Sequence, residues 1–199
     1  MSSIELTQER RHNYIVHPQK FALWLFILTV IMIFGGFTSA YIVQRGAVPA
    51  ESVIPFVLPQ FMWYTLAIVI ISSVTMQYAV WHNKRGNRSA SLLGLGLTLI
   101  LGGIFLYGQW EAFVTMTESG LPFVDQRRLD NSISFFYVIA GVHGLHIVAA
   151  IIAVLSTFWQ AAVDGFKQGR SRVVFEMTAT FWHFLGLLWV YLFLFLTYA

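Results

Sequence analysis

The chain has 199 residues, of which 57% are apolar and only 11% are charged. A soluble domain of this size carries charge on roughly a quarter to a third of its surface residues. The sequence therefore excludes most soluble enzymes, disordered scaffolds and nucleic-acid-binding proteins. It predicts a multi-pass membrane protein that has no nucleic-acid partner. Because the chain contains no cysteine, disulfides, thiolate metal sites and thiol nucleophiles are excluded as well.

Five apolar stretches are long enough to cross a membrane. A spanning helix needs about 20 mostly apolar residues, because the hydrocarbon core is roughly 30 Å thick. Backbone groups that face lipid must be paired within their own segment, so each stretch is expected to be helical. The predicted fold class is all-α, with residues 1–20 as a cytoplasmic segment and residues 21–199 as a five-helix transmembrane domain. The predicted spans, none of which contains Asp, Glu, Lys or Arg, are residues 21–43, 61–81, 89–110, 134–159 and 178–199.

The basic residues predict the orientation of these spans. Nine of the 12 lie before the first span, between the second and third, or between the fourth and fifth. Only Arg45, Arg127 and Arg128 lie on the opposite side. Because cytoplasmic loops carry the excess of Lys and Arg, the N-terminus is predicted to be cytoplasmic and the C-terminus to lie outside.

Small residues mark candidate helix-packing positions. Gly36 and Ala40 in the first span, and Ala140 and Gly144 in the fourth, are spaced four apart. Such pairs let the backbones of membrane helices approach closely, and Gly141 is assigned to the same group. The alternative is a substrate path at unwound glycines, which would require intramembrane charge. The spans contain no such charge, so we favour packing.

Three histidines lie within the spans. His143 and His146 are three residues apart, so they share one face of the fourth span, and His183 lies in the fifth. Ionisable groups at this depth indicate function, and imidazole ligates haem and metals. However, a pair three residues apart cannot supply both axial ligands of one haem. We therefore favour neutral histidines that bond between helices, to lipid headgroups or to a partner subunit; a haem held by one of the pair and His183 stays open.

Two glutamates lie at the predicted ends of spans. Glu111 follows the third span at the outer interface, and Glu176 precedes the fifth at the inner one. Glu176 is expected at a helix N-terminus, where the helix dipole favours an anion. It lies seven residues before His183, on the same helix face, which permits a shared polar seam. Both glutamates could equally be ordinary interfacial residues.

Four segments resemble a known family, namely subunit III of haem–copper terminal oxidases. The run FFYVIAGVHGLHIVAAI at residues 135–151 resembles the fourth-span signature of the five-helix form of that subunit. The run EMTATFWHFLGLLWVYLF at residues 176–193 resembles its last helix. Gln109-Trp110-Glu111 and the FGGFTSAY run at residues 34–41 are similar to the family at the corresponding places.

The resemblance implies the five-helix form of cytochrome c oxidase subunit III in the bacterial cytoplasmic membrane. Such a chain holds no cofactor, metal or active site of its own, because haem a and copper are in the partner subunits I and II. It packs on subunit I, holds phospholipid, and supports proton uptake and stability of the catalytic subunit. The residues that would contact lipid or other subunits are Gln109, Glu111, His143, His146, Glu176, Trp182 and His183.

The sequence differs from the family at two places and leaves other functions open. Val30 stands where many members carry a glutamate, and Leu185-Gly186 stands where many carry an aspartate. The first difference argues against a proton-antenna role for the first helix. The alternatives are the equivalent subunit of a quinol oxidase or nitric oxide reductase and, from other classes, a small membrane transporter or a b-type haem protein.

Overall fold

The computed structural model describes residues 18–49, 61–121, 123, 132–164 and 169–198. This part of the chain is helical and contains no strand. Each of its five helices is long and apolar enough to cross a membrane, which confirms the predicted all-α, five-span fold. The helices are α2 (Pro18–Ala47), α3 (Phe61–Lys84), α4 (Arg88–Glu118), α5 (Ser132–Asp164) and α6 (Gly169–Tyr198).

The helices extend beyond the predicted spans. At a rise of 1.5 Å per residue, the 31 residues of α4 measure about 46 Å, whereas the hydrocarbon core measures roughly 30 Å. Helix α4 therefore continues past Glu111 to Glu118, and α6 begins at Gly169 rather than at residue 178. Hydropathy detects only the part of a helix that crosses the lipid, which is why it misses these polar ends.

A tight turn joins α3 to α4. Gly86 has a φ of 73°, a left-handed conformation that glycine adopts without steric cost. Asn87 then caps α4, because its side chain accepts a hydrogen bond from the backbone N–H of Ala90 at 3.2 Å. The local sequence thus turns the chain back on itself and makes α3 and α4 an antiparallel hairpin.

Small and hydroxyl-bearing residues hold this hairpin together. A Cβ added at Gly94 would lie only 2.8 Å from the Cβ of Ala79. The Ser91 hydroxyl donates to the Ala79 carbonyl oxygen at 3.1 Å. The hydroxyls of Thr75 and Thr98 lie 2.9 Å apart and form a second hydrogen bond between the helices. Close backbone approach and interhelical hydrogen bonds are the interactions that associate membrane helices.

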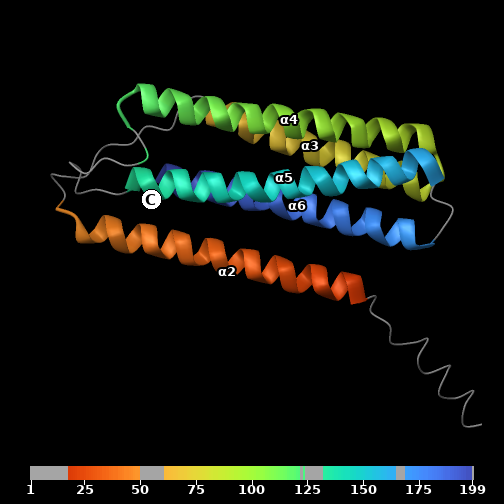
Figure 1. Ribbon diagram of the computed structural model, residues 1–199, viewed down its shortest axis with the longest axis horizontal. Helices are drawn as coiled ribbons and strands as arrows, with labels where there is room; N and C mark the ends of the chain where they lie inside the picture. Colours follow the sequence, from red (N-terminus) through yellow and green to blue (C-terminus); the bar gives the residue numbers. More distant parts are fainter. Residues whose placement is uncertain (1–17, 50–60, 122, 124–131, 165–168, 199) are drawn as a thin grey trace, which may run out of the picture.

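Helices α5 and α6 lie between the α3–α4 hairpin on one side and α2 on the other (Figure 1). The start of α2, the α3–α4 turn and the start of α6 share one end of the bundle (right in Figure 1). At this end the Lys20 ammonium pairs with a Glu176 carboxylate oxygen at 2.9 Å, joining α2 to α6. The largest fully buried side chains are aromatic, and they include Trp189, Tyr41, Phe34, Phe105, Phe136, Phe175 and Phe193.

The predicted packing glycines do not pack against other helices of this chain. A Cβ added at Gly36, Gly141 or Gly144 would meet nothing within 4 Å among the described residues. Ala40 is exposed, whereas Ala140 is buried. The structure therefore shows no contact between helices of this chain at these three glycines, because spacing identifies a helix face but not the direction in which that face points. Packing at these positions against another subunit stays a prediction.

Other glycines provide the close approaches. A Cβ at Gly102 would lie 2.8 Å from the Trp182 ring. One at Gly108 would lie 2.9 Å from the Thr65 methyl group. At Gly186 it would lie 3.2 Å from the Ser73 hydroxyl. These contacts join α4 to α6, α4 to α3 and α6 to α3.

Candidate functional site

The first motif histidine lies in the centre of the aromatic core. His143 on α5 is fully buried. Its ring stacks on that of Trp189 from α6, with the centroids 4.9 Å apart and the planes at 22°. Phe34 from α2 and Phe105 from α4 approach it edge-on, with centroids at 6.2 Å and 6.0 Å. His143 thus contacts side chains from three other helices.

The side-chain nitrogen atoms of His143 and Trp189 have no hydrogen-bond partner within the described chain. Neither ring nitrogen of His143 has a partner there, and the same holds for Nε1 of Trp189. The structure thus shows no interhelical hydrogen bond of His143 among the described residues. Aromatic rings surround the imidazole and present faces and edges to it instead of polar groups. A fully buried His143 is also placed away from the surfaces where lipid or another subunit could bind.

The second motif histidine is only partly buried. The Nδ1 atom of His146 lies 2.8 Å from the carbonyl oxygen of Val142 in its own helix. Its ring lies against Phe26 and Phe34 of α2, with centroid distances of 6.2 Å and 5.8 Å. His146 therefore contributes to the contact between α5 and α2 through its ring, and its hydrogen bond stays within α5.

Two further predicted contact residues belong to the core. Gln109 on α4 is buried, and its amide nitrogen donates to the Thr65 hydroxyl at 3.4 Å. Trp182 on α6 is buried too, and its indole N–H donates to the Ser72 hydroxyl at 3.3 Å. Both bonds end on α3, so these side chains join helices of this chain. Their predicted contact with lipid or another subunit stays a prediction.

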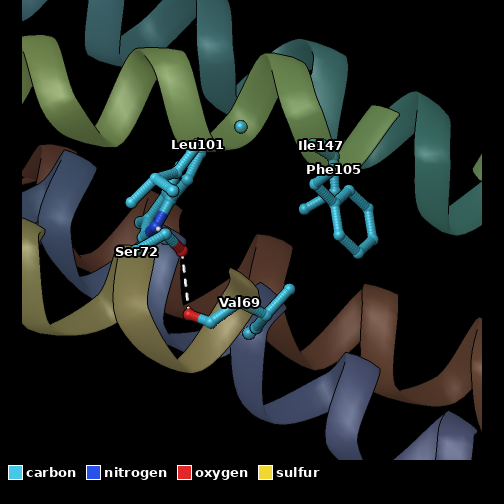
Figure 2. A pocket seen from close by; sticks show the side chains of 8 residues that line it. Val69, Ser72, Leu101, Phe105 and Ile147 are labelled. Carbon is cyan, nitrogen blue, oxygen red and sulfur yellow. Dashed lines mark hydrogen bonds between the residues drawn. The ribbon is translucent and has the colours of Figure 1, made fainter. Parts of the chain in front are cut away.

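A small cavity of about 10 Å³ lies beside Trp182, where α3, α4, α5 and α6 meet. Figure 2 shows Leu101 and Phe105 across from Val69 and Ser72, with the Ser72 hydroxyl donating to the Val69 carbonyl oxygen at 2.8 Å. A volume of this size is near the minimum that one water molecule needs. It provides no room for an organic ligand or cofactor.

Glu176 does not occupy a helix N-terminus. Helix α6 begins seven residues earlier, at Gly169, and the influence of the helix dipole falls off within the first turn. The prediction failed because the polar first turns of α6 have no hydropathy signal. Glu176 instead pairs with Lys20, and both side chains are more than a third exposed. Such a pair stabilises a fold by no more than about 1 kcal/mol.

The third histidine faces different neighbours from the first. His183 is half-buried and lines a groove between α6 and α3, whereas His143 packs on Trp189 in the aromatic core. Within the described ranges, no three His, Asp or Glu side chains gather into a group that could hold a metal ion. No role was predicted for Trp189, although its position in the tryptophan-rich last span was a usable signal for a core residue.

Comparison with known proteins decides what this bundle is. The family model for cytochrome c oxidase subunit III matches residues 3–199. The chain belongs to the cytochrome c oxidase subunit III family. It is a multi-pass subunit of a haem–copper oxidase, as its fourth-span and last-span motifs predicted.

Three relatives in the subunit III family illustrate its range. Cytochrome c oxidase subunit 3 of Synechocystis sp. is 29% identical over 196 residues, which are 94% of this chain and 79% of the relative. The protein of that name from Thermostichus vulcanus is 26% identical over 183 residues, 89% of this chain and 86% of the relative. Cytochrome bo(3) ubiquinol oxidase subunit 3 of Pseudomonas aeruginosa is 28% identical over 178 residues, which are 87% of this chain and 81% of the relative.

We expect dicyclohexylcarbodiimide to leave this subunit III unlabelled. The reagent modifies protonated, buried carboxyls, and burial favours the protonated form. Val30 is buried but carries no carboxyl, Glu176 is paired with Lys20, and Glu111 lies in the last third of the long helix α4. Mass spectrometry of the treated oxidase complex measures the labelling. An adduct on Glu111 or Glu176 would contradict this expectation and place that residue inside the hydrocarbon layer.

Proposed function

We propose that this chain is the non-catalytic subunit III of an aa3-type cytochrome c oxidase in aerobic respiration. In this proposal, haem a and copper are bound by the partner subunits I and II, and this chain packs on subunit I. The observation that carries the proposal is the enclosure of the motif residue His143 by Phe34, Phe105 and Trp189. A histidine that ligates haem or copper needs an open position beside one ring nitrogen, whereas aromatic side chains occupy the space around this ring.

The proposed contribution of the chain is to hold lipid and to stabilise the catalytic subunit. Helix α2 contacts only α5 and α6 among the described helices, and it presents exposed apolar side chains such as Trp24, Leu28 and Met32. Apolar surface of this kind is matched by acyl chains or by the helices of other subunits. Phospholipid held along α2 would then support proton uptake and stability in subunit I.

The proposed setting is the bacterial cytoplasmic membrane, with the N-terminus in the cytoplasm. Lys84, Arg85 and Arg88 lie at the α3–α4 turn, and Lys20 lies near the start of α2. These two segments share one end of the bundle (Figure 1). The clustering of cations at one end supports a cytoplasmic location of that end.

Removal of this subunit tests the proposed role. An oxidase that lacks the chain should reduce oxygen at first, because the redox centres lie elsewhere. It should then lose activity faster during turnover than the whole complex does, and it should take up protons more slowly. Oxygen consumption and proton uptake, followed over many turnovers, measure both effects. Loss of the haem or copper signals on removal of the chain would contradict a non-catalytic role.

A second candidate is the equivalent subunit of a quinol oxidase. The observation that favours it is the ubiquinol oxidase relative, whose 28% identity is close to the 29% of the Synechocystis cytochrome c oxidase relative. Oxygen consumption by the purified complex separates the candidates. Reduced cytochrome c should support turnover under the main proposal, and turnover with ubiquinol alone would establish the second.

A further inference from the structure

Three cations at the α3–α4 turn carry charge that no acidic side chain neutralises. Lys84 is the last residue of α3, Arg85 follows it, and Arg88 begins α4. All three side chains are exposed, and none forms an ion pair with Asp or Glu among the described residues. Arg88 donates a hydrogen bond to the carbonyl oxygen of Ala162, which leaves its charge in place. We call these three residues the turn cations.

The backbone between α3 and α4 holds the turn cations on a fixed frame. The N–H of Gly86 donates to the carbonyl oxygen of Asn83 at 3.0 Å, and the N–H of Asn87 donates to that of His82 at 3.0 Å. The side chain of Asn87 caps α4 directly afterwards. An anion that binds here does not have to order the loop first, which lowers the entropic cost of binding.

The aromatic residues before the turn place it at the membrane surface. The 24 residues of α3 measure about 36 Å, whereas the hydrocarbon core measures roughly 30 Å. The last turn of α3 therefore reaches the headgroup layer. Tyr78 and Trp81 are exposed near this end of the helix, and exposed Tyr and Trp are typical of the headgroup layer. The turn cations thus lie at the depth of lipid phosphates.

Arg85 brings its charge back towards the bilayer. Its guanidinium carbon lies 3.4 Å from the centroid of the Trp81 ring, which is four residues closer to the middle of α3. The ring of His82 packs edge-on against the Trp81 ring, with the centroids 4.9 Å apart and the planes at 84°. Stacking occupies the face of the planar guanidinium and leaves the N–H donors at its edge, where they can bind two oxygens of a phosphate.

We propose that the turn cations bind the phosphate of an acidic phospholipid in the leaflet at this end of the bundle (right in Figure 1). Clusters of Lys and Arg at the end of a transmembrane helix attract anionic headgroups. An acidic protein segment would have to enter the headgroup layer to reach Arg85 on Trp81, whereas lipid phosphates already lie there. The inference goes beyond the proposed function, because it requires a membrane and not an oxidase. Its chemistry also differs from the apolar lipid contact proposed along α2.

Photolabelling by lipid tests this site. The purified complex is reconstituted into phosphatidylcholine vesicles with a small share of phosphatidylglycerol that carries a photoactivatable group at the start of one acyl chain. After irradiation, mass spectrometry should find adducts around the turn, at residues 81–90. In matched vesicles phosphatidylcholine carries the same group, and it should label the turn several-fold less. Equal labelling by the two lipids would overturn the proposal.

Charge-removing variants test the turn cations themselves. Lys84→Gln and Arg85→Gln should each lower labelling by phosphatidylglycerol about five-fold, the worth of one cation at a membrane surface. Arg85→Lys keeps the charge and should retain most of the labelling. Arg45→Gln is the matched control, because Arg45 lies in the last turn of α2, at the opposite end of the bundle. Unchanged labelling in both turn variants, or an equal loss in the control, would contradict the site.

A water-soluble carbodiimide tests the competing occupant, an acidic segment of another subunit. This reagent joins an ammonium to a carboxylate in direct contact with it. A crosslink from Lys84 to Asp or Glu of another subunit would overturn the lipid site, and we expect none. Haem analysis of the same samples tests the proposed function separately. A haem-bearing complex with equal labelling by both lipids would refute the lipid site alone, and preferential labelling in a complex without haem would refute the proposed function alone.

Discussion

Gly94→Leu should prevent stable incorporation of this chain into the oxidase. A Cβ at position 94 would lie 2.8 Å from the Cβ of Ala79 and 3.0 Å from its backbone atoms. A backbone cannot move aside as a flexible side chain can, so α3 and α4 would have to separate. Their separation would also break the hydrogen bond between Thr75 and Thr98. We expect a cost of about 3 kcal/mol or more, at the upper end of overpacking effects.

Gly103→Leu is the control for this substitution. Gly103 lies in the same helix, and a Cβ there would meet nothing within 4 Å among the described residues. Its effect should stay within about 0.5 kcal/mol, as for other surface substitutions. The amount of chain that co-purifies with the complex after gentle heating measures both variants. Equal retention of the two would show that α3 and α4 do not approach at Gly94 as described.

Trp189→Ala should produce the second large loss of stability. Trp189 is fully buried, stacks on His143 and meets Phe105 edge-on at 5.3 Å. Removal of the indole leaves a cavity where α4, α5 and α6 meet, and such truncations cost about 3–5 kcal/mol. The expected result is a lower denaturation temperature of this subunit within the complex, measured by its loss from the detergent-solubilised oxidase.

Trp189→Phe separates packing from hydrogen bonding at the same position. The Trp189 indole nitrogen has no partner within the described residues, so the loss of its N–H should cost little by itself. The phenyl ring fills much of the space, and we expect the Phe variant to lose less than half as much stability as the Ala variant. If the Phe variant were as unstable as the Ala variant, the indole N–H would have to make a hydrogen bond in the assembled complex.

The sequence could predict the number and class of the helices because a single physical requirement controls both. Each apolar stretch has to cross roughly 30 Å of hydrocarbon with its backbone paired. The same requirement does not fix where a helix ends in water. Helix α4 continues through Glu118 and α6 begins at Gly169, so Glu176 was wrongly expected at a helix N-terminus.

Packing positions were harder to predict, because the sequence of one helix does not reveal its neighbours. Gly36 and Gly144 have a favourable spacing but meet no other helix among the described residues, whereas Gly94 and Gly102 meet other helices closely. His143 stands in a motif that identified the family, yet its aromatic environment comes from α2, α4 and α6 together. Such an environment exists only after the helices have assembled.

Isolation of the intact complex through this chain tests the central claim most directly. The tagged chain should be extracted in a mild detergent and the bound subunits analysed for haem and copper. We expect a larger subunit that carries two haems and copper to co-purify, and we expect this chain, once separated from it, to show no Soret band. A stable, lone 22.6 kDa protein, or a separated chain with stoichiometric haem that His183→Ala abolishes, would contradict a role as a cofactor-free subunit of the oxidase.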